Sequence, residues 1–295
     1  MEVHLVDGTY ELFRHFYGKQ PSRIDPVTGL EISAARGVVS TVVQLLEAGA
    51  THVGVATDHE VVSFRNDLWP GYKTGEGVDP ELWAQAHVSE DALVALGISV
   101  FRMTDLEADD ALGSAARVAA NDPRVRRVVI CTPDKDLGQC VDGKIVQLDR
   151  RNDRLLDVDG VREKFGVSPS SIPDYLALVG DAADGFPGLA GFGAKSAAAL
   201  IARYETIDAI PDDESTWDVP VRGAARLAAT LRSSRELAEL FKVVATLRYD
   251  ALVGEVDDWH WHQPVPGVWA TWAERFGSAS LERRVETLTR ERSRP

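Results

Sequence analysis

Acidic residues recur in this sequence just after short apolar runs or at the start of the helical segments that follow them. They are Asp7, Asp58, Glu107, Asp109, Asp110, Asp134 and Asp136, and Asp181 and Asp184 repeat the pattern further along. A lone aspartate at such a place is most often a helix N-cap or a turn residue. A convergent set is different, because two like charges about 4 Å apart repel by roughly 4 kcal/mol at an effective dielectric constant of 20. Such a set needs bound cations.

The type of ligand limits which cations could bind and which reactions they could support. Carboxylate oxygens favour Mg²⁺ or Mn²⁺, and the few histidines, including His260 and His262, show no zinc-site spacing. Two ions about 4 Å apart suit in-line displacement at a phosphodiester, because one lowers the pKa of the attacking water and the other stabilises the leaving oxygen. The sequence has no nucleotide-binding P-loop, no serine nucleophile elbow and no cysteine beside a plausible histidine base. We therefore expect phosphodiester hydrolysis.

Short valine- and isoleucine-rich runs alternate with segments of helical period, which predicts an α/β fold with a mainly parallel sheet. The expected strands are Val3–Val6, His52–Ala56, Ile98–Phe101, Val128–Cys131 and Ile145–Leu148, and the expected helices include Ser33–Glu47, Pro80–Leu96 and Ala108–Ala120. The carboxyl ends of parallel strands share one edge, where ligands bind, so the acids should converge there. Glu107 and Asp110 should share a helix face. Asp134 and Asp136 should point the same way if their strand continues.

The second half of the chain has a different pattern. Beyond about Val167 come short helices and glycine turns, which indicate a second, helical domain. From about Trp259 several tryptophans lie beside prolines, and no period is clear. We therefore expect a catalytic domain at residues 1–167, a helical domain at 168–258 and a tail of unknown role at 259–295.

The composition allows this organisation without deciding the function. A chain of 295 residues, 44% hydrophobic, has room for a catalytic domain and a smaller one. Its net charge of −14 argues against a simple polyanion binder, although divalent cations can reverse the local field of an acidic site. The two cysteines, Cys131 and Cys140, look like small core thiols and suit a reducing compartment. No signal-like start or membrane-length apolar run occurs, so we expect a cytoplasmic protein.

Two segments between the acids are candidates for substrate contacts. In the first, a glycine turn, backbone N–H groups at the start of a helix could grip a phosphate; its candidate residues are Gly191, Gly193, Lys195 and Ser196. A helix C-cap followed by an N-cap would give the same turn. The second, Phe64–Lys73, is polar and aromatic, and Arg65 with its stacking rings could hold a phosphate or an unpaired base. An ordinary surface loop with a buried tryptophan fits the second segment equally well.

The order and spacing of these residues resemble the structure-specific 5' nucleases, which include flap endonucleases and the N-terminal nuclease domain of bacterial DNA polymerase I. The resemblance runs from Met1 to about Arg248. It is carried by Leu5–Gly8, Phe64–Arg65 through Tyr72–Lys73, Glu107–Asp110, Thr132–Asp136, Gly180–Asp184, Pro187–Gly188 and Gly191–Ser196.

The resemblance implies a PIN-like catalytic domain followed by a helix-three-turn-helix domain that grips duplex DNA and binds K⁺ through its turn carbonyls. It implies one metal site at Asp7, Asp58, Glu107, Asp109 and Asp110, and a second at Asp134, Asp136, Asp181 and Asp184. It also implies that Lys73 approaches the scissile phosphate, that Tyr72 stacks on a base, and that the surrounding region forms an arch for a single-stranded flap. The resemblance also implies catalytic roles for Asp7, Asp110 and Asp134, in addition to Lys73 and Tyr72. Where the family often has a further basic residue, this chain reads Thr74–Gly77, which puts in doubt the demand for a free 5' end.

The function expected from this resemblance is a stand-alone, monomeric nuclease that uses two Mg²⁺ (or Mn²⁺) ions on 5' flaps, nicks, gaps or ends in replication and repair. RNA in the 5' strand would be tolerated. One alternative is a DNA-binding protein with a reduced metal site, although a simple binder has no need to keep the second acid set. A PIN-type ribonuclease is another, but such chains are usually much shorter and lack the glycine turn.

Overall fold

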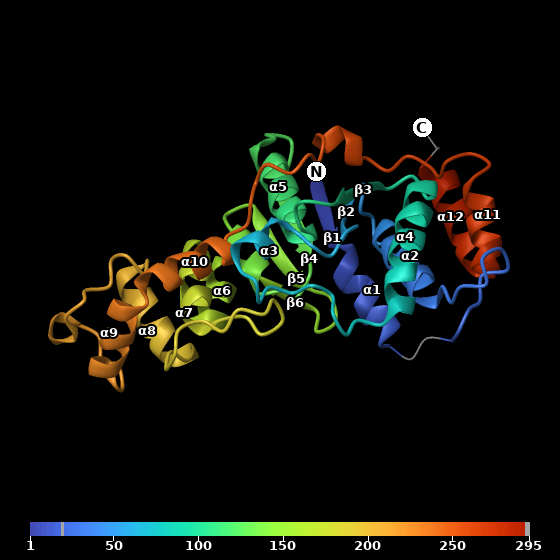
Figure 1. Cartoon of the computed structure of the whole chain (residues 1–295). Coiled ribbons are helices and arrows are strands. Elements are labelled where there is room, and N and C mark those ends of the chain that lie inside the picture. Colours follow the sequence, from blue (N-terminus) through green and yellow to red (C-terminus); the bar gives the residue numbers. More distant parts are fainter. Residues whose placement is uncertain (19–20, 293–295) are drawn as a thin grey trace. The chain divides into compact units, whose positions relative to one another are not determined.

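The computed structural model describes residues 1–18 and 21–292, and its helices and strands are labelled in Figure 1. The chain forms two compact units. Unit 1 comprises Met1–Val61, Gly75–Thr132 and Tyr249–Pro295, and unit 2 comprises Val62–Thr74 and Pro133–Arg248. Each unit therefore contains segments from distant parts of the sequence. Within the described ranges, none of the helices has the length and apolar character needed to cross a membrane.

Unit 1 is built on parallel strands in the order β3-β2-β1-β4. Their bounds are Glu2–Asp7 for β1, His52–Asp58 for β2, Ser99–Met103 for β3 and Arg127–Cys131 for β4. In β2 every residue but the last is buried, as expected for a parallel strand covered on both faces. Gly54 lies against the Phe101 ring, which a Cβ atom would meet at 2.6 Å. The strands predicted in this unit are confirmed to within one or two residues.

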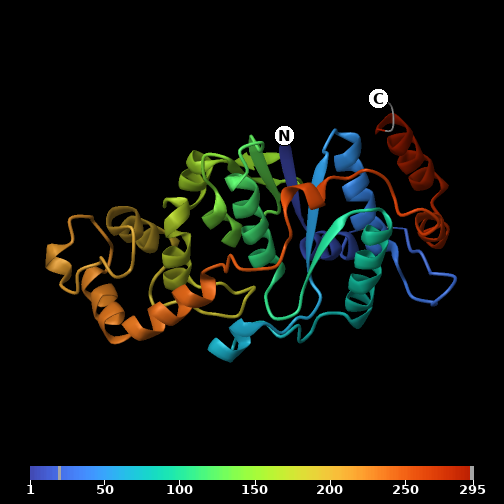
Figure 2. The same ribbon diagram turned by 90° about the horizontal axis from the view of Figure 1, so that it is seen from above.

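Helices cover both faces of these strands. They are α1 (Gly8–Phe16), α2 (Ser33–Glu47), α4 (Pro80–Ala95) and α5 (Ala108–Asn121). Helix α5 packs along the strands on one face, while α1, α2 and α4 pack together on the other (Figures 1 and 2). Helix α2 has the predicted bounds, because its apolar residues repeat with helical period and all but a few of its side chains are buried.

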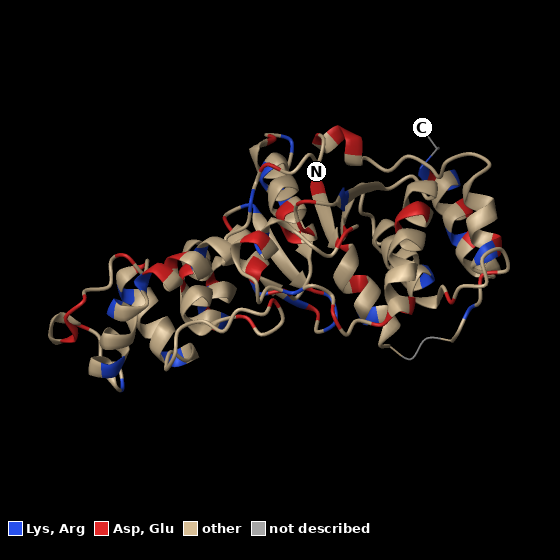
Figure 3. Ribbon diagram, in the orientation of Figure 1, with Lys and Arg blue, Asp and Glu red and all other residues tan. Residues whose placement is uncertain are grey.

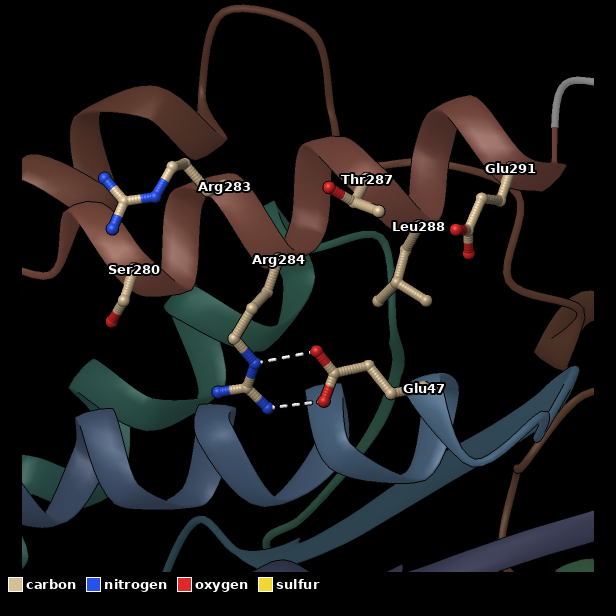
Figure 4. A pocket seen from close by; sticks show the side chains of 7 residues that line it. All are labelled: Glu47, Ser280, Arg283, Arg284, Thr287, Leu288 and Glu291. Carbon is tan, nitrogen blue, oxygen red and sulfur yellow. Dashed lines mark hydrogen bonds and ion pairs between the residues drawn. The ribbon is translucent and has the colours of Figure 1, made fainter.

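The end of the chain belongs to unit 1, where it forms η4 (Val256–Trp259), α11 (Trp269–Arg275) and α12 (Ala279–Arg292). Trp261 is buried, and its indole N–H donates to the carbonyl of Leu96. Arg284 of α12 makes two hydrogen bonds of 2.7 Å to the Glu47 carboxylate of α2 (Figure 4). The sequence showed no clear period here, because the burial depends on tryptophans packing on distant elements.

The Arg284–Glu47 pair lies beside a hollow of about 370 Å³ between α2 and α12. Its lining is Glu47, Ser280, Arg283, Arg284, Thr287, Leu288 and Glu291 (Figure 4). None of the acids predicted as metal ligands takes part in it.

Unit 2 is mainly helical. It comprises α3 (Phe64–Leu68), η1 (Asp136–Cys140), an antiparallel pair of strands β5 (Ile145–Asp149) and β6 (Arg154–Leu156), α6 (Val158–Phe165), η2 (Pro169–Ser171), α7 (Ile172–Val179), α8 (Ala194–Tyr204), η3 (Glu214–Thr216), α9 (Ala224–Ser233) and α10 (Arg235–Ala245). Its core forms where α7 packs on α8 and α10, with Leu176, Phe186 and Phe241 fully buried. The helical character predicted beyond about Val167 is confirmed. Both cysteines are buried free thiols, as expected.

Candidate active site

The acids of unit 1 lie at the carboxyl edge of its strands. Asp7 ends β1 and Asp58 ends the neighbouring strand β2. The Asp7 carboxylate caps α1 by accepting from the Tyr10 backbone N–H at 2.8 Å, and it accepts from the Thr132 hydroxyl at 2.9 Å. Asp58 accepts from the Ala108 N–H at 2.8 Å, which joins the end of β2 to the start of α5.

Helix α5 brings three more acids to this edge. Glu107 is its N-cap, and Asp109 and Asp110 lie in its first turn. The Asp110 carboxylate accepts from the Glu107 backbone N–H at 3.0 Å, so the three-residue spacing forms a capping box. Asp110 is fully buried and Glu107 is 4% exposed. The helix-cap interpretation therefore applies to these acids, and their burial is costly for charged groups. Their convergence on one metal ion stays a prediction.

Three acids of unit 2 form a cluster. One carboxylate oxygen each from Asp136, Asp181 and Asp184 lies within 4.8 Å of the other two. Asp136 and Asp181 are buried, and the Asp136 Oδ1 atom has no hydrogen-bond partner among the described residues. Burial raises the pKa of Asp136 well above its usual value, and the neighbouring carboxylates of Asp134, Asp184 and Asp181 raise it further. A buried carboxyl group with one oxygen that has no hydrogen-bond partner, in a cluster with two further carboxylates, fits a hard divalent cation.

Two lysines offset part of this negative charge. The ammonium group of Lys135 lies 2.7 Å from an Asp181 oxygen, and that of Lys73 lies 3.0 Å from Asp184. Burial lowers the pKa of Lys135, but the neighbouring carboxylates, Asp181 first among them, raise it by more. The pKa of Lys135 therefore lies above its usual value. Sequence reasoning passed over Lys135, although it stands between two of the predicted ligands.

The turn that carries Asp181 and Asp184 depends on two glycines. Gly180 and Gly188 both have positive φ, 79° and 68°. A Cβ atom on Gly188 would lie 2.4 Å from the Gly180 nitrogen, so the two backbones touch at a distance only glycine allows. The Asp181 N–H and carbonyl both bond to Phe186, which closes the turn.

The condition for the expected common orientation of Asp134 and Asp136, a strand that continues, is not met, although one carboxylate oxygen of each lies within 4.8 Å of the other. Strand β4 ends at Cys131, and Asp136 begins the 3-10 helix η1, so the strand does not continue through these residues. Asp134 is exposed, Asp136 is buried, and the Asp134 carboxylate accepts from the Asp136 N–H at 3.0 Å. Pro133 removes one backbone N–H just after the strand, which is consistent with this early end.

The segment Phe64–Lys73 is partly helical and belongs to unit 2. Ser63 caps the short helix α3, and the Arg65 side chain, 2% exposed, donates to the carbonyls of Val244 and Thr246. These contacts hold Arg65 inside the unit and do not support its predicted contact with DNA. Tyr72 is likewise buried in the core of unit 2, which does not support its predicted stacking on a base.

The glycine turn leads into α8 as expected. Gly193 is the N-cap, and its N–H and carbonyl both bond to the Ser196 hydroxyl, at 3.1 and 3.0 Å. A hollow of about 500 Å³ lies beside this helix start. It is lined by Gly191, Gly193, Ala194, Lys195, Ser196, Ala199, Pro220, Val221 and Arg222. Basic residues lie on α8 and α9, whereas the loop between these helices carries mainly acidic ones (Figure 3).

Arg222 and Arg226 are basic residues of this region that sequence reasoning missed. Arg222 lines the hollow, and the Arg226 guanidinium lies next to Gly191, where a Cβ atom would meet it at 3.4 Å. The sequence signal was a pair of arginines at the start of α9, Arg222 just before the helix and Arg226 in its first turn. The pair lies far in sequence from the glycine turn, so only the fold shows that the two segments meet.

Comparison with known proteins gives matches over most of the chain. Residues 2–166 match the family described as 5'-3' exonuclease, N-terminal resolvase-like domain, and residues 167–266 match 5'-3' exonuclease, C-terminal SAM fold. A protein named 5'-3' exonuclease from Bacillus subtilis (strain 168) is 31% identical over 245 residues, which cover 80% of this chain and 82% of that protein.

Two further matches are a curated relative and a solved structure with the same fold. DNA polymerase I of Pseudomonas aeruginosa is 36% identical over 256 residues, which cover 83% of this chain and 27% of the polymerase. The chain thus spans about a quarter of the length of that relative. The solved structure of the T5 D15 protein, co-crystallised with metal ions, matches with a TM-score of 0.66 at 17% identity, covering 98% of this chain and 99% of that one. The predicted fold class, a PIN-like α/β domain followed by a helical domain, is confirmed.

Proposed function

The chain belongs to the 5'-3' exonuclease family, as its motifs predicted, and from this premise we propose that it is a structure-specific 5' nuclease that hydrolyses DNA by a two-metal mechanism. The substrates we propose are duplexes with a 5' flap, nick, gap or end, such as arise in replication and repair. The observation that carries the proposal is the buried Asp136 carboxyl group, which has one oxygen without a hydrogen-bond partner among the described residues and lies in a cluster with Asp181 and Asp184. An arrangement so costly in a folded protein is expected where a cation is part of the function.

The two acid sets have distinct roles in this proposal. The set of Asp7, Asp58, Glu107, Asp109 and Asp110 and the set of Asp134, Asp136, Asp181 and Asp184 each hold one divalent ion. Mg²⁺ is the natural choice for all-oxygen ligands. When bound, the pair of ions supplies the charge that lowers the pKa of an attacking water and stabilises the leaving oxygen. The chain's own contribution is to hold the carboxylates in place, which the helix caps of unit 1 and the glycine turn of unit 2 do.

Lys73 is the residue we assign to the scissile phosphate. Its side chain is 33% exposed and pairs with Asp184 at 3.0 Å. An ammonium group on a flexible stem can exchange this carboxylate for a phosphate oxygen once a cation neutralises Asp184. In this proposal Lys73 stabilises negative charge on the phosphate and also releases Asp184 for metal binding.

Duplex DNA is held at the start of α8. The backbone N–H groups of the first turn and the side chains of Lys195, Arg222 and Arg226 offer donors and positive charge to phosphate oxygens. Such contacts position a duplex without reading its bases, as a nuclease directed by structure requires. Solved structures with the same fold include the catalytic core of Rad2 in complex with a DNA substrate. Binding of K⁺ by the carbonyls of this turn stays a prediction.

The test is cleavage of a labelled 5' flap duplex by the whole chain, with Mg²⁺ and with EDTA. The wild type should cut near the flap junction only with Mg²⁺. Asp181→Asn should cut at least about a hundredfold more slowly, by analogy with the loss of other charge-stabilising groups, and should still bind the flap duplex in Ca²⁺. The matched control is Glu163→Gln, which changes an exposed carboxylate of α6 and should cut at the wild-type rate.

Two outcomes would contradict the proposal. Cleavage by Asp181→Asn at the wild-type rate would exclude this acid cluster from the chemistry. Binding of the flap duplex without cleavage under Mg²⁺ or Mn²⁺ would instead favour a structure-specific DNA-binding protein with a reduced metal site.

A further inference from the structure

A second kind of metal site lies in unit 1, outside the acid clusters. We propose that His59, His87 and Glu90 bind one zinc-type transition-metal ion. His59 follows the end of β2, and His87 and Glu90 lie three residues apart on α4. One ligand atom from each of the three residues falls within 4.8 Å of the other two. Two imidazoles and a carboxylate are a common protein ligand set for Zn²⁺ and a poor one for Mg²⁺.

The measured separations suit tetrahedral coordination. His59 Nδ1 lies 3.2 Å from His87 Nδ1 and 2.8 Å from Glu90 Oε2, and His87 Nδ1 lies 3.8 Å from the same oxygen. Ligand atoms at about 2.0–2.1 Å from a tetrahedral zinc ion are about 3.3–3.4 Å apart. The three separations scatter around that value, so an ion could be accommodated with side-chain adjustments of a few tenths of an ångström.

The His59 Nδ1 atom contacts two partners in this cluster. It lies 3.2 Å from His87 Nδ1 and 2.8 Å from the Glu90 oxygen, and a neutral ring nitrogen either carries one proton or offers one lone pair. If His59 donates to Glu90, the His87 nitrogen can share that proton only as a second acceptor. If His87 donates to His59 instead, the 2.8 Å contact with Glu90 has no proton to share unless the carboxyl is protonated. A single cation between the three atoms would accept a lone pair from each of them at once.

The surroundings of Glu90 fit a ligand that is held in place. Glu90 is 1% exposed, and its other oxygen, Oε1, accepts from the Thr57 hydroxyl at 2.8 Å, which orients the carboxylate. Arg102 competes for the cluster, since its Nε atom lies 3.2 Å from Oε2. Its side chain is 38% exposed and already pairs with Asp91 at 2.8 Å, so it can keep a partner when a metal ion displaces it.

The position of the cluster indicates what the ion would do. The segment Val62–Thr74 belongs to unit 2, whereas the residues before and after it belong to unit 1. His59 precedes this segment in the chain and His87 follows it. An ion bound to both would cross-link the ends of the segment that carries Tyr72 and Lys73. This would restrict the segment in much the same way as a disulfide restricts a loop. We therefore assign the site a structural role that does not depend on the proposed cleavage reaction.

The experiment is a Co²⁺ titration of the whole chain in saturating Mg²⁺, followed by visible absorption. Mg²⁺ occupies the all-oxygen sites, and Co²⁺ in a four-coordinate nitrogen-containing site absorbs far more strongly than octahedral Co²⁺ with oxygen ligands. The wild type should develop this spectrum with one equivalent of Co²⁺ and lose it on addition of Zn²⁺. His87→Ala should weaken Co²⁺ binding by more than the roughly 10–100-fold that loss of an outer-shell partner costs. His87 is 54% exposed, so this variant should fold.

His262→Ala is the matched control, because His262 lies against His260 in the other histidine cluster of unit 1. This variant should keep the wild-type spectrum, and His59→Ala should lose it. The proposal is overturned if the wild type gives no such spectrum, if His87→Ala binds Co²⁺ as tightly as the wild type, or if only His262→Ala loses the signal.

Discussion

Replacing Asp136 by asparagine should stabilise the metal-free protein. One Asp136 oxygen lies within 4.8 Å of oxygens of both Asp181 and Asp184. At that distance a pair of unit charges repels by about 3.5 kcal/mol at an effective dielectric constant of 20. Because Lys135 and Lys73 already offset part of this repulsion, we expect a gain of about 2 kcal/mol at a pH where Asp136 is ionised in the folded protein, or roughly 4–8 °C in the unfolding midpoint.

The gain should depend on pH in a defined direction. The pKa of Asp136 is raised in the folded protein, so between the ordinary aspartate value and this raised value the folded state holds a proton that the unfolded state lacks. The wild type is therefore stabilised at low pH and loses that stability as the pH rises through the raised pKa. Asparagine does not titrate. The stability difference between variant and wild type should thus grow as the pH rises from the ordinary aspartate pKa, about 3.9, through the raised pKa of Asp136.

Urea unfolding in EDTA and in Mg²⁺ would measure both effects. Mg²⁺ at a hundredfold excess over its dissociation constant should stabilise the wild type by about 2.7 kcal/mol at this site. Asp136→Asn should lose most of that increment, while Glu163→Gln, which changes an exposed carboxylate of the same unit, should behave as the wild type. The reasoning is refuted if Asp136→Asn is less stable than the wild type in EDTA at pH 8, or if Mg²⁺ stabilises both proteins equally.

Two further predictions concern residues that stabilise the two units, an ion pair in unit 1 and a glycine turn in unit 2. Asp25 is 1% exposed and pairs with Arg275 at 2.6 Å, so Asp25→Asn should cost about 3 kcal/mol at pH 7 in urea unfolding. The Arg275 guanidinium lowers the pKa of Asp25, so the wild type loses this stabilisation as the pH falls through that lowered pKa, and a constant difference from the variant down to acid pH would contradict this. Gly188→Ala should cost more than about 2 kcal/mol and weaken Mg²⁺ stabilisation, because its φ is positive and its Cβ would meet the Gly180 backbone. Gly143→Ala, with open space around it, is the control, and equal effects of the two substitutions would count against the turn geometry.

The sequence predicted most of unit 1 because its signals are local. A parallel strand buried on both faces is a run of β-branched residues, and a helix such as α2 repeats its apolar residues every three or four positions. The acids then follow from the strand ends, since Asp7 and Asp58 are the last residues of β1 and β2. That the two acid sets serve one reaction is still a prediction.

The rest depended on contacts between distant residues. Arg65 looks like a DNA ligand in the sequence, but its donors are used by carbonyls some 180 residues away. Tyr72 is buried by the core of unit 2, which local sequence does not describe. His59 and His87 lie 28 residues apart, so no short zinc-site spacing joins them in the sequence. Only the packing of α4 beside the end of β2 brings these two rings within 3.2 Å.

The net charge of −14 is compatible with a DNA-processing enzyme when the positions of the charged residues in the fold are considered. Several acids contribute little to any surface that DNA could meet, because Glu107, Asp110, Asp136 and Asp181 are buried, and bound cations would neutralise such groups. At the start of α8 the local charge is positive, since Lys195 and Arg222 line the hollow beside the first turn of the helix. Phosphate binding responds to the local field within about a Debye length, roughly 8–10 Å, and not to the total charge of the chain. The acidic composition is therefore weak evidence against DNA binding.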